Sequence, residues 1–336
     1  MSTANDRMRR KIMGHIVSQA IHAVSQLGVP DLLAKNPVSL PELAAATGSH
    51  MDALQRFMRV LSAEGVFDEP YPDTFTLTEM GELLRTDVDG SLKNLSSLMA
   101  GEAYHAWSEA GHSLLTGKPA FDHAYGLPYF DWLAKNPEAA QNFHQGQAGL
   151  VKMRLIPLLE REWGPNDEVV DVGGGNGTLL ISLLKENEGM RGIVFDLPQA
   201  LDQTQQALAN AGLTDRAVCL AGDFFTSVPA GADVYVLSQI LHDWDDQNAA
   251  SILKQCHAAM TPKSRLLILD QVLPKHDRLH PPAHPSALLD LHMLILLGGR
   301  ERSEDSWNIL LNECGFRVTS EIKKGPRSSL IEVAAA

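Results

Sequence analysis

The 336-residue sequence is poor in features that mark several protein classes. It has only three cysteines, an odd and isolated set, which argues against a disulfide framework. No apolar run approaches the roughly 18 residues of a membrane span, and the first residues are polar and charged, unlike a signal peptide. We therefore expect a cytoplasmic protein that does not bind membranes.

Positive charge is also scarce. The formal net charge is −13, which opposes binding to nucleic acids or to anionic lipids. The hydrophobic content of 44% and the charged content of 21% are ordinary for a globular protein. The length suits two domains, which we place at residues 1–150 and 151–336.

The N-terminal part has the order of a winged helix. Apolar residues at helical spacing over 11–27 predict a first helix, and Ser39 with Glu42 forms a capping box that begins a second. A third helix is predicted over 51–63 and a hairpin over 65–78. Residues 1–100 carry nine Lys and Arg against twelve Asp and Glu, so a dimerisation or lid role is favoured over DNA binding.

More helix is predicted over 92–115, followed by a segment dense in aromatic residues and by a helix from about 137 to 162. Trp107 and Phe143 from this part, and Met293 from the last third, are candidates for the wall of a substrate pocket. Core packing is an equally good interpretation of each of the three.

The second half is organised around the sequence VVDVGGGNG at 169–177. A short β-branched run predicts a buried parallel strand, and the glycines after it predict a tight turn that a ligand can approach closely. Gly173, Gly175 and Gly177 do not have the spacing of a dinucleotide fingerprint, and no Lys-Ser/Thr pair of a P-loop follows.

Strands and helices then alternate, with strand cores at 168–172, 192–196, 217–221, 233–238 and 265–270. Helices are predicted near 286–297 and 303–313, and closing strands at 316–322 and 329–333. Such alternation predicts an α/β fold with a doubly wound sheet, whose ligands bind beyond the carboxyl ends of the strands.

Acidic residues and one histidine stand at those strand ends. Asp196 is placed to accept hydrogen bonds from the two hydroxyls of a ribose, and Asp223-Phe224 follows the next strand. A glycine turn, a ribose acid and then Asp-Phe is the order of an S-adenosylmethionine site. His242 follows the fourth strand, and Asp270 and Glu301 are carboxylates able to fix its tautomer.

The sequence resembles the small-molecule O-methyltransferases that use S-adenosylmethionine, a group of plant caffeate and flavonoid enzymes and bacterial polyketide and phenazine enzymes. The matching segments are GKPAF at 117–121, AYG at 124–126, DVGGGNG at 171–177, FDLP at 195–198, GDFF at 222–225, LHDW at 241–244 and GGRER at 298–302.

The resemblance implies a Rossmann-like class I methyltransferase sheet with an N-terminal, mainly helical, winged-helix-like dimerisation domain that intertwines in a homodimer. It implies cofactor contacts from Gly173, Asp196, Asp223, Phe224, Ser238 and Trp244. It also implies that His242 is the catalytic base, flanked by Asp270 and Glu301. S-adenosyl-L-homocysteine is then the product, and no metal is required.

We therefore expect neutral His242 to take the proton of a phenol or N-hydroxyl in an aromatic natural product. We expect this product to belong to secondary metabolism, for example to antibiotic biosynthesis. One alternative is a relative that has drifted to N-methylation, decarboxylation or hydroxylation. Another is a ligand-sensing DNA-binding regulator. His276, His280 and His284 recur every fourth residue, but the prolines among them argue against a helical metal site.

Overall fold

A computed structural model describes residues 3–88, 90–201, 203–274, 285–325 and 328–336. The described chain groups into two compact units, Met1–Tyr104 with Glu138–Gly149, and His105–Pro137 with Leu150–Ala336. The segment from 105 to 137 thus packs with the second unit, and the domain boundary near residue 150 stays a prediction. The repeated histidines at 276, 280 and 284 lie outside the described residues.

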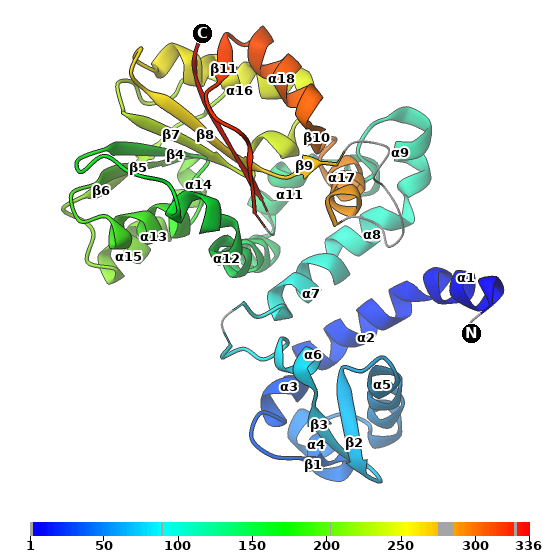
Figure 1. Ribbon diagram of the computed structural model, residues 1–336. Helices are drawn as coiled ribbons and strands as arrows, with labels where there is room; N and C mark the ends of the chain where they lie inside the picture. Colours follow the sequence, from blue (N-terminus) through cyan, green and yellow to red (C-terminus); the bar gives the residue numbers. More distant parts are fainter. Residues whose placement is uncertain (1–2, 89, 202, 275–284, 326–327) are drawn as a thin grey trace. The chain divides into compact units, whose positions relative to one another are not determined.

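The first unit is a set of helices with a small sheet (Figure 1). Its helices are α1 (Ala4–Ile12), α2 (Gly14–Gln26), α3 (Val29–Leu32), α4 (Leu40–Thr47), α5 (Met51–Ala63), α6 (Glu79–Glu82) and α7 (Lys93–Ala100). Strands β1 (Val38–Ser39), β2 (Phe67–Tyr71) and β3 (Thr74–Leu77) pair in the antiparallel order β1-β3-β2. This is the predicted succession of helices followed by a hairpin.

Local sequence explains the helix start at α4. The Ser39 hydroxyl donates to Glu42 Oε2 at 2.6 Å, and the Ser39 backbone N–H donates to the same oxygen at 3.1 Å. The predicted capping box is therefore present. The predicted first helix is wrong at its beginning, because α1 precedes it and the helical run breaks at Met13.

The second unit contains most of the remaining elements. Helix α8 (Glu102–Ser108) begins in the first unit, and α12 (Pro137–Leu159) crosses from one unit to the other. The other helices are α9 (Ala110–Thr116), α10 (Ala120–Tyr125), α11 (Tyr129–Lys135), α13 (Thr178–Glu186), α14 (Pro198–Leu201), α15 (Thr204–Asn210), η1 (Leu241–Asp243), α16 (Asp246–Ala259), α17 (Pro285–Leu296) and α18 (Glu304–Glu313). The helix predicted over 92–115 is divided into α7, α8 and α9, with Gly101 ending α7.

An eight-stranded sheet forms the centre of this unit, in the order β11-β13-β8-β7-β4-β5-β6 with β12 beside β13. Its strands are β4 (Glu168–Val172), β5 (Arg191–Asp196), β6 (Ala217–Ala221), β7 (Val234–Ser238), β8 (Arg265–Asp270), β11 (Phe316–Val318), β12 (Lys323–Lys324) and β13 (Ser329–Ala335). Strands β4 to β8 in this sheet are parallel, and β13 runs antiparallel to β8. The predicted doubly wound sheet is confirmed.

The order of strands reverses at β4, which has β5 on one side and β7 on the other. A doubly wound sheet binds its ligands at such a switch point, beyond the carboxyl ends of the strands. The glycine turn at 173–177 follows β4 directly, so the chain direction puts this turn where a ligand is expected.

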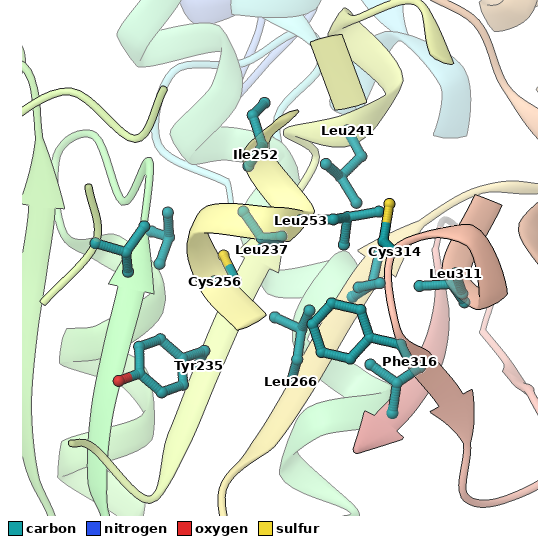
Figure 2. Packing of buried hydrophobic residues seen from close by; sticks show 14 of the residues in the cluster. Tyr235, Leu237, Leu241, Ile252, Leu253, Cys256, Leu266, Leu311, Cys314 and Phe316 are labelled. Atoms are coloured by element: carbon teal, nitrogen blue, oxygen red, sulfur yellow. The ribbon is translucent and has the colours of Figure 1, made fainter. Parts of the chain in front are cut away.

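Alternate residues of each parallel strand face two separate cores. Val170 and Tyr235 pack on one face with α16 and α18, whereas Val169 and Val234 pack on the other face with α12, α13 and α15. Figure 2 shows the first core, where side chains of α16 lie against β7 and β8 beside Phe316. Burial on both faces explains why the strands read as continuous apolar runs.

A short parallel pair, β9 (Val272–Leu273) with β10 (Arg302–Ser303), was not predicted. It joins the chain after β8 to the chain before α18. None of the helices in the described ranges is both long and apolar enough to cross a bilayer.

Candidate active site

The glycine turn after β4 is shaped by backbone conformations that favour glycine. Gly173, Gly175 and Gly177 have φ angles of 74°, 52° and 73°. A Cβ atom at Gly173 would collide with the Ile240 side chain at 2.5 Å, whereas one at Gly175 would meet open space. The turn therefore packs tightly on its inner side and leaves its backbone bare at Gly175.

Asp196, at the end of β5, is tied to this turn. Its Oδ2 accepts a hydrogen bond from the Gly175 N–H at 2.8 Å, and its Oδ1 accepts one from the Leu197 N–H at 2.7 Å. The carboxylate is half-buried and held in one orientation, as a ribose-binding acid requires.

A buried carboxyl group lies beneath the turn. Asp171 in β4 is 2% exposed, and its Oδ2 has no hydrogen-bond partner within the described part of the chain. Burial, and then the charge of Asp196, raise the pKa of Asp171 to about 7. Its Oδ2 would also block a Cβ at Gly174, so the second glycine of the run is needed for space.

Asp223, after β6, orders a turn that carries two aromatic rings. Its Oδ1 accepts a hydrogen bond from the Phe225 N–H at 2.8 Å. The rings of Phe224 and Phe225 meet Trp244 edge to face, with centroids 6.3 Å and 4.8 Å from the Trp244 centroid. The structure thus brings Phe224 and Trp244 into one aromatic group beside Asp223, and such rings suit a flat purine.

The turn after β7 contains a residue with a strained backbone. Ser238 ends the strand half-buried, and Gln239 has a φ of 57°, one of two positive values among the non-glycine residues of the described chain. The Gln239 amide donates to the Leu269 carbonyl at 2.9 Å and to Asp270 Oδ1 at 3.3 Å. These bonds hold a backbone conformation that costs roughly 1–3 kcal/mol.

His242 follows in η1 and is paired through both ring nitrogens. Its Nδ1 lies 2.6 Å from Glu301 Oε1, and its Nε2 lies 3.3 Å from Asp243 Oδ1. The imidazole is 6% exposed and the Glu301 residue 3% exposed. The sequence prediction named Glu301 as a partner of His242 but overlooked Asp243.

These carboxylates change the protonation of the ring. Burial alone would lower the pKa of His242, but the charges of Glu301 and Asp243 outweigh it and raise that pKa to about 10. The expectation of a neutral imidazole at pH 7 is therefore wrong for the resting site, because it ignored the two acids. Burial likewise raises the pKa of Asp243 to about 6.

Asp270, at the end of β8, is fully buried and acts on His242 only by its charge. It accepts the hydrogen bond from Gln239, while its Oδ2 has no partner among the residues described. Burial raises the pKa of Asp270 to about 7. Within the described part of the chain, Glu301 and not Asp270 is hydrogen-bonded to the imidazole.

A loop from the far end of the chain fixes the position of Glu301. A Cβ at Gly299 would collide with the His242 carbonyl, so only glycine allows the loop to lie against η1. The Arg300 N–H donates to that same carbonyl at 2.8 Å, and the Glu301 N–H donates to Asp290 Oδ1 at 2.8 Å. Asp290 was missed, since nothing local in the sequence links it to the histidine.

Arg302 completes this support and was also missed. It is 2% exposed and donates to the carbonyls of Leu241 and Trp244 at 2.8 Å and 2.9 Å. Its Nε donates to Asp246 Oδ1 at 2.9 Å. A single guanidinium therefore closes the turn that carries His242, which is a use of the five fixed donors of arginine.

The three substrate candidates fall in different places. Trp107 is half-buried in α8 and Met293 is 7% exposed in α17, both in the second unit. Phe143 is half-buried in the part of α12 that belongs to the first unit. Their contact with a substrate stays a prediction.

The residues around the glycine turn fit S-adenosylmethionine. Gly175 leaves open space, Asp196 offers oriented acceptor oxygens, and the rings near Trp244 offer an aromatic face. Within the described ranges, no three His, Cys, Asp or Glu residues are grouped to hold a metal ion.

Two family models match this chain, one in each of its two parts. A family model of the O-methyltransferase domain matches residues 107–317, and a model of the O-methyltransferase dimerisation domain matches residues 10–87. The phenazine O-methyltransferase PhzM of Lysobacter antibioticus is 38% identical over 322 residues, covering 96% of this chain and 93% of that protein. The phenazine-1-carboxylate N-methyltransferase of Pseudomonas aeruginosa is 30% identical, covering 97% and 96%.

Solved structures are similar over the same length. The crystal structure of LaPhzM superposes with a TM-score of 0.92 at 36% identity and covers 100% of both chains. An O-methyltransferase from neocarzinostatin biosynthesis, solved with S-adenosylmethionine and 2-hydroxy-5-methyl naphthoic acid, has a TM-score of 0.82 at 31% identity. It covers 95% of this chain and 96% of its own.

Proposed function

Because the chain belongs to the S-adenosylmethionine-dependent O-methyltransferase family, we propose that it methylates a phenol or N-hydroxyl of an aromatic natural product with His242 as general base. The observation that carries the proposal is the buried pair of His242 Nδ1 and Glu301 Oε1 at 2.6 Å. This pair stands beyond β7, on the same edge of the sheet as Asp196.

Gly173, Asp196, Asp223, Phe224, Ser238 and Trp244 would hold the cofactor, by the geometry described above. Bound there, S-adenosylmethionine supplies an electrophilic methyl group on a sulfonium and leaves as S-adenosylhomocysteine. The protein must therefore orient a nucleophilic oxygen and remove its proton.

His242 is suited to remove that proton. Glu301 holds Nδ1 at 2.6 Å, whereas Asp243 Oδ1 lies farther from Nε2, at 3.3 Å, so Nε2 is the nitrogen that would take the proton of a hydroxyl. A phenol has a pKa of about 10, and the acids around His242 raise the pKa of its imidazolium to about 10. Proton transfer between groups of matched pKa is nearly balanced, so the phenolate forms beside an imidazolium that Glu301 and Asp243 stabilise.

The raised pKa of His242 limits the fraction of enzyme that holds an active base at neutral pH. An imidazolium with a pKa of about 10 is mostly protonated at pH 7, so only a small fraction of the resting enzyme holds the base in its active form. The proposed reaction therefore accelerates as the pH rises toward 10.

The substrate class follows from the relatives. Proteins of antibiotic and secondary-metabolite biosynthesis recur among them, including a mitomycin 6-O-methyltransferase and an O-demethylpuromycin-O-methyltransferase of Streptomyces. We propose a hydroxylated aromatic substrate of this kind. The match to the dimerisation domain supports a homodimer, and the cytoplasmic location stays a prediction.

N-methylation is the second candidate, since two relatives bear N-methyltransferase names. The buried His242–Glu301 pair favours the hydroxyl, because an amine nucleophile already has a free electron pair and needs no base of this strength before attack. Decarboxylation and hydroxylation are less supported, because these reactions need no such base. The acidic N-terminal segment argues against a DNA-binding regulator.

The test is a methyl-transfer assay with matched nucleophiles. The purified protein and S-adenosylmethionine are incubated with hydroxynaphthoates, hydroxyphenazines and the corresponding amines, and products are weighed by mass spectrometry. We expect a gain of one methyl group on a hydroxyl. If only the amines were methylated and none of the hydroxyls, N-methylation would replace the proposal.

A further inference from the structure

A second histidine near the active site has its protonation fixed by a neighbour. Trp107 Nε1 donates a hydrogen bond to His292 Nδ1 at 3.1 Å. The two rings are 15° from parallel with centroids 6.3 Å apart, so they lie side by side, nearly coplanar. The indole N–H therefore approaches Nδ1 close to the imidazole plane, where its lone pair lies.

This bond determines the tautomer of His292. An indole nitrogen only donates, so Nδ1 must accept and cannot carry a proton. A doubly protonated ring would set two N–H groups against each other. Burial, and then the charge of His242, lower the pKa of His292 to about 4, in agreement with a ring that stays neutral. The single proton is therefore on Nε2.

The Nε2–H group is left as a donor without an acceptor. His292 is 9% exposed, and no hydrogen bond from Nε2 is made to any residue that the structure describes. An N–H group that makes no such bond can donate to a bound molecule or to water. Because its proton is fixed on Nε2 and its ring is held by a second side chain, His292 can recognise an acceptor atom of a ligand.

The position of His292 relates it to the catalytic group. It lies on α17, the helix whose Asp290 accepts the N–H of Glu301, and Glu301 in turn holds His242. Met293, a candidate for substrate contact, is the next residue. His242 is near enough for its charge to act on His292. One helix thus supports the base and presents a separate donor.

We propose that His292 is a specificity-determining residue that donates from Nε2–H to an acceptor atom of the substrate, a ring nitrogen or a carbonyl oxygen close to the hydroxyl that is methylated. Trp107 is the positioning residue that keeps this donor in place. The inference rests on the proposed methyl transfer and deepens it, because it states which hydroxyaromatics the site accepts.

The experiment compares two probes of the same three-ring shape. 1-Hydroxyphenazine has a ring nitrogen beside the hydroxyl, and 1-hydroxyanthracene has a C–H there. We expect the preference for the phenazine in kcat/KM to fall by roughly 10- to 100-fold in His292→Phe. His292→Gln, which keeps an N–H donor, should retain most of it. Taking the ratio between probes within each variant cancels their different intrinsic reactivity.

Trp107→Phe is the second variant, in case His292→Phe fails to fold. It removes the indole N–H while keeping an aromatic ring, and it should reduce the preference severalfold. His257→Phe is the matched control, because His257 lies on α16, where its ring contacts Phe316 of β11. S-adenosylhomocysteine affinity and melting temperature should stay close to wild type in the variants that are compared.

Nitrogen NMR of the histidine-labelled protein reads the tautomer without any turnover. The His292 signal, identified by its loss in His292→Gln, should show Nε2 protonated and Nδ1 unprotonated between pH 6 and 8. A protonated Nδ1, or a probe preference that is unchanged in His292→Phe, would overturn the inference and leave the proposed function standing. If neither probe binds to the enzyme loaded with S-adenosylhomocysteine, the aromatic substrate class is wrong and both proposals fall.

Discussion

The glycine turn after β4 and the histidine turn after β7 stand at the same edge of the sheet but are built in opposite ways. The glycine turn depends on backbone: three glycines have positive φ angles, and Gly175 faces open space. The histidine turn depends on side chains, since His242 is held at 2.6 Å by Glu301, which is 59 positions away in the sequence.

The difference separates binding from chemistry. A bare backbone with one oriented acid lets a ligand approach closely, as cofactor binding requires. The buried acids around His242 instead adjust the affinity of one nitrogen for a proton. Substitutions in the first turn should therefore change affinity, and substitutions in the second should change turnover.

The largest expected effect is on turnover. His242→Gln should reduce kcat by roughly 10²–10⁴, because a general base is lost. S-adenosylhomocysteine affinity, measured by calorimetry, should remain near wild type. His257→Gln is the control, a histidine of α16 that contacts Phe316 and should leave kcat unchanged. Wild-type turnover in His242→Gln would mean that the ring is structural.

The next effect is on affinity. Asp196→Ala should weaken S-adenosylhomocysteine binding by on the order of a hundredfold, since two charge-assisted hydrogen bonds of about 1.5–3 kcal/mol each are removed. Asp215→Ala, at an exposed position of the same unit, is the matched control. Unchanged affinity in a folded Asp196→Ala protein would remove this residue from the cofactor site.

A smaller effect on kcat is expected from the loop that supports the histidine turn indirectly. Gly299→Ala should lower kcat by roughly 10- to 100-fold, because the added methyl group pushes the loop of Glu301 away from the His242 carbonyl. Gly111→Ala, at a helical position with nothing within 4 Å of the added atom, should be neutral. Equal activity of the two variants would show that the loop adapts without moving Glu301.

The sequence predicted the glycine turn well because its signals are local. Strand, glycines and Asp196 follow one another within 30 residues, and each has a distinct backbone or hydrogen-bonding role. The strands of the sheet were predicted for the same reason, since continuous β-branched runs bounded by turns have few other interpretations.

The histidine turn was predicted only in part. The residue types His242 and Glu301 were found, but their contact depends on Gly299, Asp290 and Arg302, which come together only through the fold. The protonation of the imidazole was mistaken for the same reason: a pKa depends on distances between charges, and no local pattern contains them. Asp243 was overlooked although it is adjacent in sequence, because adjacency says little about which way a side chain points.

The pH dependence of kcat/KM for a phenolic substrate tests the central claim most directly, that acids around His242 raise its pKa while it acts as the base. The neutral imidazole is the active form, so below a pKa of about 10 its fraction grows about tenfold per pH unit. We expect log kcat/KM to rise with a slope near one from pH 6 to about 9, and to level off at lower pH in Glu301→Gln. A wild-type profile that is already flat above pH 7 and is the same in Glu301→Gln would contradict the account.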